Sequence, residues 1–305
     1  MVRPDGSIAD SCHEPVLPSS PSPGFVEFDP ARMADAALSV ARQVLARGGP
    51  VEAVGIANQR SSTVVWDAAT GAAVGPGIGW QDLRTAGTCL MLQGQGIRLA
   101  PNASATKVAY LLDSYDYNRA RNLKFGTVDS WVIWHLTRGD AHVTDATNAG
   151  VTGLVSGDGS AGWDTEVLDA LRIPAAMLPT IVDSSAQPGQ AGYATALDGA
   201  PPITGIAGDQ QASLVGQGCT RPGLAKATFG TGGMLDVCLG PRPEFEYRGP
   251  GGCFPIVAWR RGGHDTWGIE AIMLSAGTAV EWLRDDLGII ATSAESEQVA
   301  AGCAD

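Results

Sequence analysis

The first half of the chain alternates short apolar runs with longer amphipathic segments. Residues 51–57 (VEAVGIA) predict a buried strand, and residues 63–66 predict a second one. Before them, a helix is predicted to run to about Leu45, with Asp29 as its N-cap and Pro30 as its first residue. The alternation continues to about residue 150 and favours the α/β class, with a mixed sheet flanked by helices.

The second half contains two segments with the composition of connecting structure. Residues 163–189 predict a helix and then a loop broken by proline, and the Pro/Gly-rich residues 240–252 indicate a domain boundary. The pattern beyond predicts a strand at 254–259, a turn at 260–264 and a helix from about Glu270 to Leu287. We therefore predict one domain over residues 1–240 and the beginning of a second over 241–305.

Composition and charge narrow the classes of function. With 44% hydrophobic and 17% charged residues, the chain of 305 residues can form a sizeable core. A formal net charge of −12 argues against nucleic acid as a partner, although a nucleotide can still bind at a local Gly-rich turn. No apolar run reaches ~18 residues and no signal peptide is evident, so we expect a cytoplasmic protein without a membrane partner. The six cysteines are scattered singly, which predicts reduced thiols and no metal site.

Two polar segments follow the first strands. Asn58, Gln59 and Arg60 come at the end of the first predicted strand, where ligands of α/β sheets bind. Arg60 offers a fork of donors for hydroxyl groups, although it could equally be a plain surface arginine. Trp80, in GIGWQDLRT, could form an apolar wall against a sugar or polyol; the alternative is a core tryptophan. The polar residues after it, Gln81, Asp82 and Arg84, could supply hydrogen bonds to the same ligand.

Two further segments carry glycine and polar residues. In GIAGDQQ, Asp209 follows an apolar strand and could take a proton from a substrate hydroxyl, or it could cap the next helix. The turn at residues 230–233 (GTGG) can direct backbone N–H groups at phosphate oxygens, although such turns also occur in ordinary hairpins. None of these four segments identifies a function by itself.

The order of these motifs is more specific than any one of them. NQR, WQD-x-R-T, SATK, FGTVDSW, GIAGDQQ, FGTG and AGTAVEWLRD follow one another as in the glycerol kinase branch of the FGGY carbohydrate kinases. The chain resembles that family from Asp5 to about Ile289, most specifically at residues 124–150 and 203–219. The resemblance implies an actin-like ATPase (ribonuclease H-like) fold with two domains. It also implies ATP-dependent phosphorylation of a hydroxyl group of a small polyol or sugar.

The resemblance also implies roles for individual residues. Asp209 would be the catalytic base with Gln210 beside it as a substrate ligand, and Arg60 and Trp80 would line the polyol pocket. Gly230 and Thr231 would approach the phosphates of ATP, and Gly277 would lie near the nucleotide. Mg²⁺ would accompany ATP, bridging its phosphates, and no residue is assigned as a dedicated metal ligand.

The sequence departs from the family's pattern at four site positions. Ser61 stands where the family has an acidic residue, Asn102 stands in the place of an aromatic pair, and Met234 replaces another aromatic residue. These three remove a carboxylate and aromatic walls from the substrate pocket. Glu281 stands near the expected nucleotide site, where the family has glutamine.

The family's pattern also extends beyond both ends of this sequence. It opens with a strand and a phosphate-binding D-x-G-T turn, and it continues well past residue 305. We therefore expect a first domain without its first strand, a truncated second domain, and little ATP binding by these residues alone. An incomplete gene and a chain that needs a complementing chain or a homo-oligomer remain open, as does a non-catalytic polyol-binding or scaffold remnant.

Overall fold

The computed structural model describes residues 1–156, 162–230, 232–245, 249–273 and 275–303. The chain forms two compact units. The first comprises Met1–Ala212 with Trp259–Asp265, and the second comprises Ser213–Ala258 with Thr266–Asp305. The units thus change over near Ser213, whereas the sequence places the start of the second domain at residue 241. The limits of the functional domains stay a prediction.

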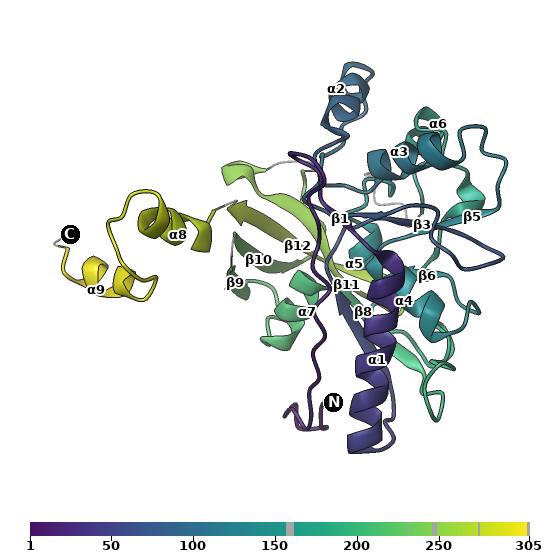
Figure 1. Cartoon of the computed structure of the whole chain (residues 1–305), viewed down its shortest axis with the longest axis horizontal. Coiled ribbons are helices and arrows are strands. Elements are labelled where there is room, and N and C mark those ends of the chain that lie inside the picture. Colours follow the sequence, from purple (N-terminus) through teal and green to yellow (C-terminus); the bar gives the residue numbers. More distant parts are fainter. Residues whose placement is uncertain (157–161, 231, 246–248, 274, 304–305) are drawn as a thin grey trace. The chain divides into compact units, whose positions relative to one another are not determined.

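The first unit combines parallel and antiparallel strand pairs with helices packed against them (Figure 1). β2 pairs in parallel with β8, as does β6 with β7, while β3–β5 and β1–β4 are antiparallel. This mixture agrees with the predicted α/β class. The strands are β1 Glu27–Phe28, β2 Val54–Asn58, β3 Val64–Asp67, β4 Gly77–Ile78, β5 Leu123–Gly126, β6 Val143–Asp145, β7 Thr180–Val182 and β8 Ile203–Gly208. The helices are α1 Pro30–Gly48, α2 Ala86–Gly94, α3 Ala105–Tyr115, α4 Val128–Leu136, α5 Ala146–Ala149, α6 Thr165–Ala170, a 3₁₀ turn Ala175–Met177, and α7 Asp209–Gly216, which leads into the second unit.

Helix α1 forms as its sequence predicts. The Asp29 carboxylate accepts hydrogen bonds from the backbone N–H groups of Ala31 and Arg32, which the start of the helix would otherwise leave without acceptors. The helix ends at Gly49, whose φ of 84° suits glycine and whose N–H reaches the carbonyl of Leu45. α1 packs beside α4 over the strands (Figure 1).

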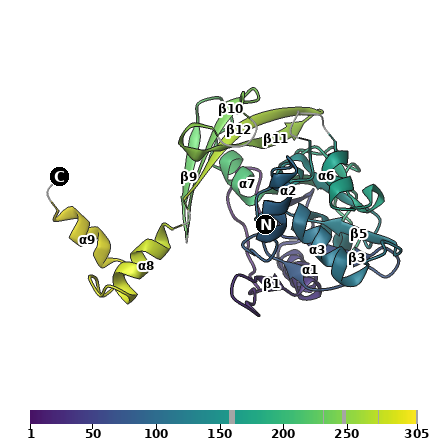
Figure 2. The ribbon, with the colours of Figure 1, turned by 90° about the horizontal axis from the view of Figure 1, so that it is seen from above.

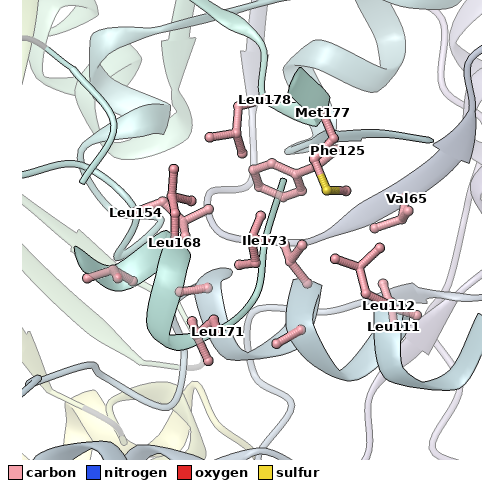
Figure 3. Packing of buried hydrophobic residues seen from close by; sticks show 14 of the residues in the cluster. Val65, Leu111, Leu112, Phe125, Leu154, Leu168, Leu171, Ile173, Met177 and Leu178 are labelled. Carbon is pink, nitrogen blue, oxygen red and sulfur yellow. The ribbon is translucent and has the colours of Figure 1, made fainter. Parts of the chain in front are cut away.

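A continuous apolar cluster holds α3, α6 and the β3–β5 pair together (Figure 3). Leu111 and Leu112 of α3 are almost fully buried against Phe125 of β5 and Val65 of β3. Each such side chain contributes about 1.5–3 kcal/mol through its removal from water. Leu168 and its neighbours from the 163–178 segment close the other side of the cluster, so the predicted connecting segment is part of the core.

The second unit is built on a four-stranded sheet in the order β11-β12-β10-β9 (Figure 2). β10 lies antiparallel to both of its neighbours, β9 and β12. The elements are β9 Ala225–Phe229, β10 Gly233–Gly240, a 3₁₀ turn Pro250–Gly252, β11 Phe254–Arg261, β12 His264–Met273, α8 Gly277–Asp285 and α9 Glu295–Ala301. The turn of the β11–β12 hairpin is counted with the first unit. This hairpin lies where the sequence predicts it.

Three secondary-structure predictions were wrong. The helix predicted from Glu270 begins only at Gly277, because Glu270 pairs with Asp236 across the β10–β12 ladder and is fully buried there. The strand predicted over 51–57 begins at Val54 and leaves every second residue exposed. The sequence on either side of a predicted turn at Asp5 and Gly6 also indicated short strands, but these residues form only a bridge between Val2 and Ile8. Pairing across the sheet overrides local preference at Glu270.

Within the described residues, no helix is both long and apolar enough to cross a bilayer.

Asp129, at the start of α4, is a fully buried carboxylate. It accepts hydrogen bonds from the hydroxyls of Thr127 and Thr144, the second at 2.7 Å. Burial, and next the nearby charge of Asp145, raise the pKa of Asp129 to about 6. The folded protein therefore binds this proton more tightly than the unfolded chain, which favours folding at low pH. That contribution is lost as pH rises through about 6.

Asp129→Asn is expected to gain stability relative to wild type as pH rises. Asparagine cannot ionise, so the variant escapes the cost of a buried charge that wild type bears above pH 6. From pH 5 to pH 7.5, the free energy of unfolding of the variant should rise relative to wild type by about 1.4 kcal/mol. Urea denaturation at the two pH values measures this, and titrating groups that do not interact with Asp129 cancel in the difference. If the difference in free energy of unfolding between variant and wild type did not change with pH, Asp129 would not be the titrating group.

Candidate active site

The first polar segments emerge together at one edge of the first unit. β2 and β8 are parallel neighbours in register, with Asn58 opposite Gly208 at their carboxyl ends. Parallel strands end at the same edge of a sheet, and ligands of α/β proteins bind at such edges. Residues 59–60 and 209–211 therefore leave the sheet side by side, although about 150 residues separate them in sequence.

Arg60 and Asp209 meet at this edge. The Arg60 Nε atom lies 3.6 Å from Asp209 Oδ1, with 11% of the Arg60 side chain and 48% of the Asp209 side chain exposed. A glycine at 208 allows this approach, because a Cβ there would lie 2.5 Å from the Arg60 Cδ atom. The site thus presents a half-exposed carboxylate beside a mostly buried guanidinium.

Asp209 is the first residue of α7, and its Oδ1 atom accepts a hydrogen bond from the Gln210 N–H at 2.9 Å. The capping alternative is therefore compatible with a second role, since nearly half of the side chain still faces solvent. Gln210 itself is buried. Of the two, only Asp209 presents an exposed acceptor to a ligand.

Ser61 adopts an unusual backbone conformation next to Arg60. Its φ is 60°, in the left-handed region that non-glycine residues seldom occupy, and its side chain is buried. The Ser61 hydroxyl donates to the carbonyl of Val151 at 3.1 Å, and its own carbonyl accepts from the hydroxyls of Thr63 and Ser104. Backbone strain of this kind costs of order 1–3 kcal/mol and persists where the surroundings fix it.

Trp80 and Asn102 lie on loops that one buried lysine joins. The Lys107 Nζ atom donates to the carbonyls of Gly79 at 2.9 Å, Trp80 at 3.2 Å and Asn102 at 3.0 Å. Burial lowers the pKa of Lys107 to about 8. Trp80 and Asn102 are both half-buried, so the structure brings these two predicted pocket residues together through their backbones.

Asp82 and Arg84 do not supply the free hydrogen-bonding groups considered from the sequence. Arg84 NH2 lies 2.8 Å from Asp82 and 2.8 Å from Glu27, and its guanidinium stacks 4.1 Å from the centre of the Phe25 ring. Asp82 is fully buried and also accepts from the Val26 N–H. Both side chains hold the loop after Trp80 in place. Nothing in the local sequence predicts this pairing, because Glu27 and Phe25 lie more than 50 residues away.

The predicted nucleotide residues belong to the second unit. The N–H of Gly277, at the start of α8, donates to the carbonyl of Gly230 at 2.8 Å, so these two predicted residues do meet. Glu281 lies one turn further along α8 and is exposed, and Met234 is half-buried in β10. Thr231 lies outside the described residues. The roles of these five positions, Met234 as a substrate contact and the other four as nucleotide contacts, stay predictions.

A family comparison matches this chain to the description "FGGY family of carbohydrate kinases, N-terminal domain" over residues 1–216. That match covers well over half of the chain. The chain belongs to the FGGY family of carbohydrate kinases. The resemblance inferred from the motif order is thereby confirmed.

Several glycerol kinases share about two fifths of their aligned residues with this chain. The glycerol kinase of Methylobacterium nodulans is 41% identical over 319 aligned residues, which cover 98% of this chain and 62% of the relative. The glycerol kinase of Alkalilimnicola ehrlichii is 43% identical, with 92% of this chain and 59% of the relative covered. The chain therefore spans about three fifths of the length of the curated relatives it matches.

Solved structures of FGGY kinases share the fold. The Plasmodium falciparum glycerol kinase with ADP matches with a TM-score of 0.88 at 23% identity, covering 98% of this chain and 63% of that one. A ligand-bound xylulose kinase from Lactobacillus acidophilus matches with a TM-score of 0.83 at 19% identity, covering 99% and 63%. The predicted actin-like ATPase fold is thereby confirmed.

The sequence reasoning missed two groups of site residues in this FGGY chain. It used SATK only as a motif and gave Lys107 no role, although an ammonium buried among carbonyls is a strong positioning device. It also passed over the polar run TDATNA, residues 144–149, all of which are buried. A run of polar residues between apolar segments was the available signal, because buried polar side chains must find partners.

Proposed function

We propose that this chain is the substrate-binding part of a kinase that transfers the γ-phosphoryl group of ATP to a hydroxyl of a small polyol or sugar. The observation that carries the proposal is the half-exposed Asp209 carboxylate at the carboxyl edge of two parallel strands, 3.6 Å from Arg60. A carboxylate so placed can accept a proton from a hydroxyl group that docks at the edge. Membership of the FGGY family supports the class of reaction.

In the proposed reaction, Asp209 takes the hydroxyl proton as the oxygen bonds to the γ-phosphorus and the bond to ADP breaks. Arg60 orients the carboxylate and can donate to a neighbouring substrate hydroxyl. Trp80 offers an apolar face to the carbon skeleton. Such catalysis rests mainly on positioning and charge stabilisation, which rigid strand ends provide.

The proposed nucleotide contacts lie at the Gly230–Gly277 junction of the second unit, with Glu281 nearby. ATP would bring Mg²⁺, held largely by phosphate oxygens and water. In the described part of the chain, no three Asp, Glu, His or Cys side chains gather to hold a metal ion. We therefore assign no residue of this chain to the metal.

The proposed substrate is larger than glycerol. Ser61 uses its hydroxyl on the Val151 carbonyl and offers no carboxylate to a ligand, while Asn102 stands in the place of an aromatic pair. Loss of one charged partner for a substrate hydroxyl costs roughly 1.5–3 kcal/mol. A longer polyol or a sugar can fill the wider pocket and recover contacts that glycerol cannot make.

Glycerol is therefore expected to be about one to two orders of magnitude poorer in kcat/KM than the best compound in a panel of polyols and sugars. The measurement is substrate-dependent ADP release by a protein that spans the full length of its relatives. The glycerol kinase of Methylobacterium nodulans serves as the comparison enzyme in the same panel. Glycerol ranking first for this protein would overturn the pocket argument.

The same assay tests the proposed function itself. ADP release that depends on both protein and polyol or sugar supports the kinase proposal. Binding of a polyol without any ADP release across the panel would instead identify a non-catalytic polyol-binding protein.

A further inference from the structure

A buried aspartate that the proposed chemistry does not use lies at the centre of the first unit. Asp145 is the last residue of β6, the N-cap of α5, and fully buried. Its two oxygens accept from the backbone N–H groups of Thr147 and Asn148, from the side chains of the same two residues, and from the Ser184 hydroxyl at 2.6 Å. Five donors to one carboxylate fix its position in the core.

One branch of this network reaches the strand that ends at Asp209. The Thr147 hydroxyl donates to Asp145 Oδ1 at 2.9 Å and accepts from the backbone N–H of Gly208 at 2.8 Å. Gly208 is the last residue of β8 and immediately precedes Asp209. The hydroxyl therefore fixes the peptide from which the proposed base projects.

A second branch reaches the strand that leads to Arg60. The Asn148 side-chain amide donates to Asp145 Oδ1 at 2.9 Å and to the side-chain Oδ1 of Asn58 at 3.1 Å, and the Asn58 side-chain amide donates back to Asn148 Oδ1 at 2.9 Å. Asn58 is the last residue of β2, two positions before Arg60. This reciprocal amide pair is buried and fixes the end of β2.

A third set of hydrogen bonds connects Asp145 to Ser184 and Arg260. The Ser184 hydroxyl that donates to Asp145 also accepts from the backbone N–H of Arg260, and the Ser184 N–H donates to the Arg260 carbonyl at 2.9 Å. Ser184 and Arg260 thus hold Asp145 from one side, while Thr147 and Asn148 connect it to the ends of β8 and β2 on the other.

We propose that Asp145 is a positioning residue for the phosphoryl transfer, acting through Thr147 on Asp209 and through Asn148 on Arg60. The inference rests on the proposed function, because positioning has meaning only if these two residues act together. It predicts that the hydroxyl of Thr147 matters, and not only the volume of its side chain.

Two substitutions at Thr147 separate positioning from packing, in a protein that spans the full length of its relatives. Thr147→Val keeps the shape but removes the hydroxyl, and it should lower kcat about 10- to 100-fold while KM changes less than threefold. Thr147→Ser restores the hydroxyl and should return kcat to within about threefold of wild type. A valine variant with wild-type kcat, or a serine variant as slow as the valine variant, overturns the proposal.

Asp145→Asn tests the centre of the network, with Asp129→Asn as the matched control. Both neutralise a fully buried aspartate, but the two hydroxyls that donate to Asp129 belong to Thr127 and Thr144, and neither residue lies in β2 or β8. We expect a loss of kcat of at least about 10-fold for Asp145→Asn and less than threefold for Asp129→Asn. Equal losses would mean that any buried charge change disturbs the site, and the proposal would fail.

Amide hydrogen exchange provides a readout that does not depend on activity. Thr147→Val should increase exchange of the Gly208 N–H at least 10-fold, because that N–H loses its acceptor, whereas Thr147→Ser should preserve protection. Unchanged protection in the valine variant refutes the positioning link. If wild type shows no substrate-dependent ADP release, the proposed function fails, and the exchange comparison still decides whether the network fixes the strand end.

Discussion

Asp209→Asn is expected to lower turnover by ~10²–10⁴ in a protein that spans the full length of its relatives. The reason is that asparagine cannot accept the hydroxyl proton, while its shape preserves the docking edge. KM for the sugar or polyol should change far less than kcat, since Arg60 and Trp80, the proposed substrate contacts, are unchanged. Steady-state measurement of substrate-dependent ADP release gives both quantities.

The fold of this variant should survive. Asparagine can still accept the Gln210 N–H at the start of α7, and the position is nearly half exposed. Asp198→Asn, on an exposed turn of the same unit, is the control and should retain wild-type turnover. Near-normal turnover of Asp209→Asn, with circular dichroism showing an intact fold, would exclude Asp209 as the base.

Lys107→Met is expected to lower the free energy of unfolding at pH 7 by about 2 kcal/mol. The Gly79 carbonyl keeps the Asp82 N–H as a donor, whereas the partly buried carbonyls of Trp80 and Asn102 lose the ammonium, at ~1–3 kcal/mol for each. Relief from burying a charge offsets only part of this. Urea denaturation measures the change.

Lys124→Met is the matched control for this loss. Lys124 makes one exposed hydrogen bond, to the carbonyl of Ala176 at 3.2 Å, so its replacement should cost less than about 1 kcal/mol. A loss at Lys107 no larger than that at Lys124 would show that the three carbonyls do not depend on the ammonium.

The pH dependence at Lys107 has a definite sign. The pKa of Lys107 in the folded protein, about 8, lies below the ordinary lysine pKa of 10.5, so between these values the unfolded chain holds the proton more often than the folded protein does. The cost of burying the charge is complete below pH 8 and is relieved as pH rises toward 10.5. Wild type should therefore gain up to about 3 kcal/mol relative to Lys107→Met across this window. A difference that stays flat from pH 8 to 10.5 would contradict the lowered pKa.

The sequence predicted features that depend on residues close together in the chain or on the general geometry of parallel strands. Asp29 and Pro30 predicted the start of α1, because capping depends on residues within one turn. The polar residues after β2 and β8 could be placed near one another, because parallel strands share an edge. The pairing of Arg60 with Asp209 follows from those two facts and the small side chain of Gly208.

The sequence was silent where partners lie far apart along the chain. Nothing near Asp82 and Arg84 predicts that Glu27 and Phe25 will engage Arg84, and so their side chains were considered as ligands for substrate. Glu270 was predicted to begin a helix, but its strand pairing with Asp236 is set by the sheet. The links from the Asp145 network to Asn58, Ser184 and Gly208 were missed for the same reason, since each of these bonds joins residues 39 to 90 positions apart.

The parallel pairing of β2 with β8 has a consequence for how the protein is made. These strands are separated by about 150 residues, so β2 must wait for its partner during synthesis. At ~5–20 residues per second, that wait lasts about 10–30 s. Closing so long a loop also carries an entropic cost that local helices do not bear, so helices such as α1 can form first. On the ribosome, the edge that carries Arg60 and Asp209 is therefore among the last features of the first unit to assemble.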